Sequence, residues 1–309
     1  MGGSNYVVRY GMKFGKWLVG WIAGGCAVFL ALNSASGAQA LLPCIADTAL
    51  SQQSPDNNFG GASSLPIGRT STGARSRGLY KFAVTNIPAG ATIHSATLEL
   101  EVVLNNLEED RSFSVHRVRT GWGEGNKAGE DAATAGEATW NARFFPDLLW
   151  SLPGGASDVD FVGTPSASEE LSGIGRYIFT SDTLVSDVQR WLNNPGTNFG
   201  WLVKIDSESV NGTELMFASR EDTEGAGPTL RVQYDLPGQS RPRLMNSRRE
   251  GLAFVFDFNA DPSRPYFIEY STNLRNWTLL DLVPPGPART VTISDPMGTE
   301  PRFYRITAL

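Results

Sequence analysis

Alternation of apolar and polar residues runs along most of this chain and predicts short β-strands. The clearest case is residues 92–103, where Ala96, Leu98, Leu100 and Val102 alternate with more polar neighbours. A period of two places these four side chains on one buried face of a strand. Comparable patterns predict further strands at residues 45–51, 77–84, 112–119, 177–179, 201–205, 213–219 and 229–234.

One segment departs from this alternation and predicts a short helix. Apolar residues between 185 and 192 recur at a spacing of three to four, and Ser181 or Asp182 can cap the first turn. The sequence Asn-Asn-Pro-Gly at residues 193–196 ends the helix. We expect this helix to lie across one end of a β-sandwich. The apolar residues 201–205 then predict a strand in the middle of a sheet.

A long segment between the strand patterns, residues 121–175, is rich in Gly, Ala and acidic residues. Segments of this length inside a domain are usually functional or disordered. Because it carries Trp122, Trp140 and Trp150, we expect it to be ordered.

The strands predict an all-β fold with two β-sandwiches. Residues 41–236 form the larger sandwich, with one short helix, and residues 237–243 read as a linker from their Pro, Gly and Ser content. Residues 244–309 contain about five short strand patterns and predict a smaller sandwich of the immunoglobulin or fibronectin type.

Residues 1–40 have the pattern of a secretory signal peptide. Arg9, Lys13 and Lys16 precede an apolar run at residues 17–32, and Ala-Gln-Ala at residues 38–40 suits cleavage after Ala40. The alternative is a membrane anchor, although the run is shorter than the roughly 20 residues that span a bilayer. We therefore expect an extracellular protein with no membrane span after cleavage. Its one remaining cysteine, Cys44, excludes an intramolecular disulfide.

The charge is unevenly distributed. Removing three basic residues with the signal peptide leaves 23 basic and 32 acidic residues, a net charge of 23 − 32 = −9. Residues 41–238 hold 14 basic and 25 acidic residues, or −11, whereas residues 239–309 hold 9 and 7, or +2. This balance argues against nucleic acid or an anionic membrane as the partner, and leaves a local basic groove possible.

Catalytic motifs are absent from the sequence. Its two histidines, His94 and His116, lie within strand patterns, where surface or packed side chains are the usual interpretation. No nucleophile elbow, P-loop or zinc-ligand spacing is present. Acidic residues could pair as in glycoside hydrolysis, but their separation is not set by the sequence. We expect the chain not to be an enzyme.

Short segments spread over residues 45–234 resemble the DNRLRE domain, which is grouped with carbohydrate-binding module family 96. No single segment is specific, and the resemblance depends on their order and spacing. They are residues 46–48 (ADT), 58–60 (NFG), 78–82 (GLYKF), 87–91 (IPAGA), 95–98 (SATL), 138–141 (ATWN), 187–191 (DVQRW), 198–201 (NFGW), 217–221 (FASRE) and 228–232 (PTLRV).

This resemblance implies a jelly-roll β-sandwich that binds an acidic polysaccharide, alginate being the ligand known in the family. Such domains usually occur as non-catalytic modules of secreted bacterial proteins. Residues 266–278 (YFIEYSTNLRNWT) and 302–305 (RFYR) look like a C-terminal β-sandwich typical of secreted proteins of Verrucomicrobia and Planctomycetes.

A binder of uronate polymers needs Arg or Lys for the carboxylates and aromatic faces for the sugar rings. Three basic residues of residues 75–81 share one strand parity, and others lie on strands expected nearby. The alternative is that these charges only keep the sheet soluble. The candidate carbohydrate-binding residues are Arg69, Arg75, Arg77, Lys81, Trp122, Lys204 and Arg220.

Clustered oxygen ligands suggest a structural calcium ion as cofactor. Asp47, Asp56 and Asn57 are the candidate ligands, and the acidic loop at residues 124–131 is the alternative. No EF-hand loop is present.

Three functions remain open from the sequence. The first is a secreted, non-catalytic protein that binds an acidic polysaccharide. The second is a structural or adhesive protein whose sandwiches contact cell-surface or matrix proteins. The third is a polysaccharide hydrolase or lyase. An exposed basic groove would favour the first, and an apolar patch the second.

Overall fold

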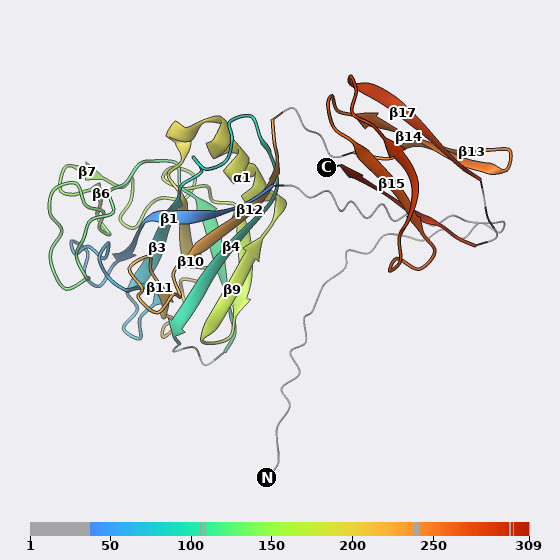
Figure 1. The fold of residues 1–309 in the computed structure, drawn as a ribbon. Helices are drawn as coiled ribbons and strands as arrows, with labels where there is room; N and C mark the ends of the chain where they lie inside the picture. Colours follow the sequence, from blue (N-terminus) through green and yellow to red (C-terminus); the bar gives the residue numbers. More distant parts are fainter. Residues whose placement is uncertain are drawn as a thin grey trace, which may run out of the picture. The chain divides into compact units, whose positions relative to one another are not determined.

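The computed structural model describes residues 38–105, 107, 109–237, 242–296, 298 and 300–308. The described residues divide into two compact units, 38–237 and 242–308 (Figure 1). The predicted signal peptide lies outside the described residues except for its last three positions, and the centre of the predicted linker lies outside them too. Within the described part of the chain, no helix is long and apolar enough to cross a membrane.

The larger unit is a β-sandwich with one α-helix, as predicted. Its elements in chain order are β1 (Ala38–Ser51), β2 (Ser64–Arg69), β3 (Arg75–Phe82), β4 (Thr92–Leu104), β5 (Arg111–Arg117), β6 (Ala142–Phe144), β7 (Leu148–Leu149), β8 (Ala167–Leu171), β9 (Gly175–Thr180), α1 (Asp182–Asn193), the 3₁₀ helix η1 (Pro195–Thr197), β10 (Trp201–Ile205), β11 (Leu215–Ala218) and β12 (Thr229–Asp235).

Two sheets face each other, and β1 belongs to both. The first half of β1 pairs with β12, which continues through β4 to β9, β11 and β2. After a bulge between Cys44 and Ala46, the second half pairs with β3, which continues through β10 and β5 to β8. A strand that bends at a bulge can change sheets. The residues just beyond this bulge therefore lie where the two sheets meet.

The core lies between the sheets. Ala96, Leu98, Leu100 and Val102 of β4 are at most 2% exposed, which confirms the predicted buried face. They share one hydrophobic cluster with residues of the opposite sheet, among them Phe113 of β5.

The helix α1 closes one end of the sandwich. The Ser181 hydroxyl accepts a hydrogen bond from the Leu184 N–H, so Ser181 is the N-cap. The amide of Gln189 bonds the backbone of Ala91 and Ile93, where β4 begins. Trp191 packs against Trp201 of β10 in a tilted arrangement, with ring centroids 4.4 Å apart. As predicted, β10 is an inner strand, between β3 and β5.

Residues 118–166, between β5 and β8, carry β6 and β7 and are ordered. They cover the outer face of the second sheet and are called the covering segment below (Figure 1). Trp140, Trp150 and Phe161 of this segment pack on Leu79 of β3 and Leu202 of β10 in a separate hydrophobic cluster. Both tryptophans are at most 5% exposed. The second sheet is therefore covered on both faces.

Strands without an apolar pattern on one face were not predicted from the sequence. β2 contains Pro66 and Gly68, which weaken any strand prediction. β8 is a sheet-edge strand, and its three central residues are exposed. Edge strands need no alternation, because solvent covers most of their side chains.

The smaller unit consists of β13 (Met245–Glu250), β14 (Ala253–Ala260), β15 (Tyr266–Ser271), β16 (Thr278–Val283), β17 (Arg289–Pro296) and β18 (Phe303–Ala308). They form two three-stranded sheets, β13-β14-β17 and β16-β15-β18. Phe256, Phe258, Tyr266 and Ile306 are fully buried in one shared core. The unit is thus a small β-sandwich. Its edge strand β13 was not predicted, because five of its six residues are exposed.

Candidate functional site

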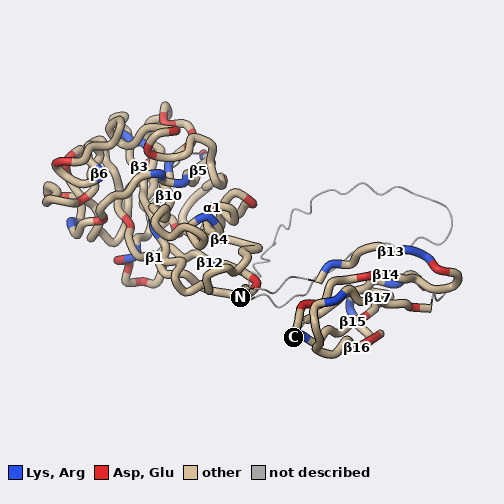
Figure 2. The backbone as a smooth tube through the Cα atoms, turned by 90° about the horizontal axis from the view of Figure 1, so that it is seen from above, with Lys and Arg blue, Asp and Glu red and all other residues tan. Residues whose placement is uncertain are grey.

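Three of the predicted basic residues line one cleft of about 570 Å³. Arg75 and Arg77 come from β3 and Lys204 from β10, and the residues around Leu152 and Ser157 form the opposite wall. The covering segment packs over Leu79 on the same strand face and reaches Arg77 through the carbonyls of Gly154 and Gly155, whereas Arg75 stays partly exposed. The cleft therefore lies at the Arg75 end of the strand, where the covering segment leaves side chains accessible. Figure 2 shows basic positions of β3, β5 and β10 near one another.

Arg77 is held in place by the protein itself. Its Nε and Nη2 atoms each donate to Glu208 at 2.7 Å, and Nη1 donates to the carbonyls of Gly154 and Gly155 at 2.8 and 2.9 Å. The residue is 7% exposed. These bonds use four of the five N–H donors of the guanidinium, so Arg77 has little capacity left for a ligand. Arg77 thus ties β3 to the covering segment and to the loop that carries Glu208.

Arg75 and Lys204 are available. Neither forms a salt bridge with any described residue, and both are partly exposed. The Arg75 guanidinium bonds Gln52 and lies 5.7 Å from the centroid of the Trp140 ring. The Lys204 ammonium donates to the carbonyl of Ile205. These two cations can receive a carboxylate or hydroxyl group of a ligand.

The pKa shifts follow from burial and from this arrangement. Burial lowers the pKa of Lys204, with Glu208 acting in the opposite direction. Burial alone would raise the pKa of Glu208, but the hydrogen bonds and charge of Arg77, helped by Lys204 and Arg75, lower it. Burial also lowers the pKa of His116, which lines the cleft. Both of its ring nitrogens are hydrogen-bonded, to Ser114 and Val162.

A second depression of about 490 Å³ adjoins the cleft and shares Gln52, Arg75 and Glu208 with it. It adds Arg69, whose guanidinium donates to the carbonyls of Gly73 and Glu208 and forms no salt bridge among the described residues. The cleft and this depression together hold Arg69, Arg75, Arg77 and Lys204 against Asp206 and Glu208, which gives 4 − 2 = +2. The site is locally positive within an acidic unit.

The other predicted carbohydrate-binding residues lie elsewhere. On the face of β3 that carries Arg77, fully buried Leu79 separates Arg77 from Lys81. Trp122 is half-buried and donates its indole N–H to the carbonyl of Phe199. Arg220 pairs with Glu124 and Glu221. The structure therefore brings together four of the seven predicted residues.

Aromatic stacking faces are scarce at the cleft. Trp140 and Phe161 line it but are only 4% and 3% exposed. Leu152, 62% exposed, is the large apolar side chain at the rim. Polar contacts are thus the main recognition chemistry that the cleft offers.

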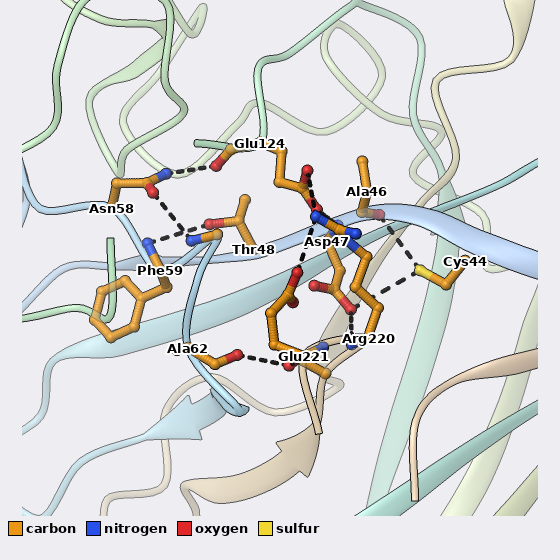
Figure 3. A network of polar contacts seen from close by, with 12 residues as sticks. Cys44, Ala46, Asp47, Thr48, Asn58, Phe59, Ala62, Glu124, Arg220 and Glu221 are labelled. Carbon is orange, nitrogen blue, oxygen red and sulfur yellow. Dashed lines mark hydrogen bonds and ion pairs between the residues drawn. The ribbon is translucent and has the colours of Figure 1, made fainter. Parts of the chain in front are cut away.

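The structure separates the predicted calcium ligands. The Asp56 carboxylate accepts from the Asn141 amide, and the Asn57 amide donates to the Gly129 carbonyl. Asp47 instead approaches Glu124 and Glu221, and one ligand oxygen from each of the three lies within 4.8 Å of the others (Figure 3). Burial raises the pKa of the Asp47 carboxyl to about 8, and the neighbouring carboxylates act in the same direction.

Several site residues were not singled out from the sequence. Gln52, Glu208 and Leu152 lie in loops with no motif around them. Glu221 follows Arg220 within the FASRE segment, but that segment carried no sign of what its glutamate contacts.

Comparison with known proteins gives one family match. Residues 38–142 match the family model of carbohydrate-binding module family 96. No curated protein matches the chain. The crystal structure of β-1,2-glucanase from Parabacteroides distasonis aligns at 10% identity over 85% of this chain, with a TM-score of 0.17. At that score the alignment supports no argument, and this chain spans about a third (34%) of the glucanase chain.

The matched residues run from β1 to the start of β6 and include Arg69, Arg75 and Arg77. Lys204, the fourth basic residue of the site, lies outside the matched residues. Residues 38–142 of this chain are therefore similar to carbohydrate-binding module family 96, and this similarity supports carbohydrate binding by the larger unit.

Proposed function

We propose that this chain is a secreted, non-catalytic protein that binds a polysaccharide in the cleft beside β3 and β10. The observation that carries the proposal is the pair of partly exposed cations, Arg75 and Lys204, in a concave site of the unit that matches a carbohydrate-binding family. Concave sites with a few convergent polar groups are the usual form of ligand sites.

The cations favour an acidic polysaccharide with a carboxylate on its rings, of the alginate type. Arg69, Arg75 and Lys204 have no carboxylate partner among the described residues, so each can pair with a uronate group. The two adjoining depressions give a chain of sugars more than one contact point. The local balance of +2 contrasts with the acidic unit around it, so attraction is confined to short range.

The cleft's chemistry favours binding over catalysis. Among the described residues, Glu208 is the one carboxylate that lines the cleft, and Arg77 holds both of its oxygens. His116 has both ring nitrogens occupied. Neither group is free to transfer a proton to a glycosidic oxygen. Incubation with the bound polysaccharide should therefore release no reducing ends and no unsaturated sugar, and either product would point to a hydrolase or lyase.

Titration calorimetry of the protein with alginate and with a neutral glucan tests the site. Arg75→Ala and Lys204→Ala should each weaken alginate binding by roughly 10- to 100-fold, since a charge-assisted hydrogen bond contributes about 1.5–3 kcal/mol. Arg190→Ala is the matched control, because Arg190 is exposed on α1 and forms no salt bridge among the described residues. Added salt should weaken binding by the wild-type protein.

Equal binding of the neutral glucan would contradict the proposal that the ligand is acidic, but the cleft would remain the proposed binding site. Unchanged binding in both cleft variants would place the glycan elsewhere. No binding to any polysaccharide would favour the second candidate function, an adhesive protein.

A further inference from the structure

Three carboxylates from distant parts of the chain meet where the two sheets of the larger unit join. Asp47 lies on β1 just beyond its bulge, Glu124 lies near the start of the covering segment, and Glu221 follows β11 (Figure 3). Their ligand oxygens lie within 4.8 Å of one another. Like charges at this spacing repel, so the cluster needs a compensating group.

Two oxygens of this cluster have no hydrogen-bond partner among the described residues. Asp47 is fully buried, and its Oδ1 atom accepts no hydrogen bond from a described residue. Its Oδ2 atom accepts a hydrogen bond from the backbone N–H of Arg220 at 2.7 Å. The Oε2 atom of Glu221 is also buried and without a partner. An unpaired carboxylate oxygen in a protein interior is costly. A ligand at these two atoms would remove that cost.

Arg220 neutralises only part of the charge. Its guanidinium pairs with both oxygens of Glu124 and, at 2.9 Å, with Oε1 of Glu221. With all three carboxylates ionised, as metal ligands must be, one guanidinium leaves a formal charge of −3 + 1 = −2. The two oxygens that Arg220 leaves free are Asp47 Oδ1 and Glu221 Oε2. Both the charge and the free oxygens match a divalent cation.

We propose that Asp47, Glu124 and Glu221 form a binding site for a calcium ion. The ligand atoms are carboxylate oxygens, which hard cations prefer. Calcium accepts irregular geometry and sheds its water more readily than magnesium, so it suits a largely buried site. The Arg220 side chain is 38% exposed, so it can move into solvent if the calcium ion also coordinates Glu124.

Such an ion would connect three segments that no disulfide can join. β1, the covering segment and the loop after β11 would share one ligand. Since the covering segment also forms a wall of the cleft, calcium would stabilise the proposed glycan site without contacting it. The site inference itself does not depend on glycan binding.

The test uses the purified protein after dialysis against EDTA, with CaCl₂ as the probe and no glycan present. Calorimetry should show one calcium bound per chain. At free calcium about one hundred times the Kd, the unfolding midpoint of the larger unit should rise by about 5 to 10 °C. MgCl₂ at the same concentration should raise it less.

Substitutions of the proposed ligand residues test where the calcium ion binds. Asp47→Asn and Glu221→Gln should lose calcium binding and the calcium-dependent rise in the midpoint. Asp56→Asn and Glu130→Gln, two exposed acidic positions nearby in sequence, are the matched controls and should keep both. If Asp47→Asn does not fold, Glu221→Gln alone decides the result.

Two results would overturn the inference. One is calcium binding that survives in Glu221→Gln and Asp47→Asn. The other is no calcium binding by the wild-type protein, together with an Asp47→Asn variant at least as stable as the wild type. That second result would mean that a proton shared between Asp47 and Glu221 compensates the cluster.

Discussion

Two arginines on one strand face have different roles because of what covers them. Arg75 and Arg77 are two residues apart on β3, and both approach the Trp140 ring at 5.7 Å. Arg77 lies under the covering segment and donates four hydrogen bonds to the protein, whereas Arg75 is partly exposed and bonds Gln52. Their identical chemistry and parity made them equal candidates in the sequence. The positions of Glu208, 131 residues later, and of the Gly154 and Gly155 carbonyls distinguish them.

This difference predicts opposite effects on stability. Arg77→Ala leaves the largely buried Glu208 carboxylate unpaired and should lower the free energy of unfolding by about 3–5 kcal/mol. Arg75→Ala removes a partly exposed side chain and should change it by no more than about 0.5 kcal/mol. Urea unfolding of both variants measures the difference. Equal losses would show that Arg77 does not connect the segments as described.

The same ion pair predicts a dependence on pH. Arg77 holds the pKa of Glu208 below its ordinary value of 4.5, so the pair's contribution is complete above that pH. It is lost as the pH falls through the lower, folded-state pKa. The ordinary pKa of a glutamate, about 4.5, lies within the range from about pH 5 to about pH 3. As the pH falls through this range, the unfolding free energy should therefore fall more steeply for the wild type than for Glu208→Gln.

Glu130→Gln is the control for this experiment, because Glu130 is exposed. It should keep the steep dependence of the wild type. A Glu208→Gln variant with the same slope as the wild type would rule out the ion pair as the source of the acid sensitivity.

Elements with a one-sided apolar pattern were predictable, and elements without one were not. β4 and α1 bury one face each, so their periodicity appears in the sequence. β13 and β8 are edge strands with mostly exposed side chains, and β2 is interrupted by Pro66 and Gly68. The covering segment has almost no regular structure, so its tryptophans predicted order without predicting which sheet face it covers.

The cap of α1 gives a prediction at this scale. Ser181→Ala removes the acceptor for the Leu184 N–H and should destabilise the larger unit by about 0.5–2 kcal/mol. Ser186→Ala is the same chemical change at an exposed position of the same helix, and should cost less. Thermal unfolding of the two variants gives the comparison. Equal midpoints would mean that the cap contributes nothing.

At the scale of the whole molecule, the candidate sites depend on contacts between distant segments. The cleft combines β3 and β10 with the covering segment, and the carboxylate cluster combines β1, the covering segment and the loop after β11. A sequence identifies the residue types for each chemistry. It does not show which of them the topology brings together, and so Asp56 and Asn57 were natural but separate choices beside Asp47.

The pairing of β1 with β12 has a consequence for export. Ala38, Gln39 and Ala40 lie opposite Tyr234, Gln233 and Val232 in that ladder. Cleavage after Ala40 would remove these three residues and leave the backbone groups of β12 unpaired along that stretch. An open strand edge accepts a further strand from another chain. If the proposed signal peptide is cleaved, the position of the cleavage site would decide whether the mature protein keeps β12 paired at this edge or leaves it open to a strand from another chain.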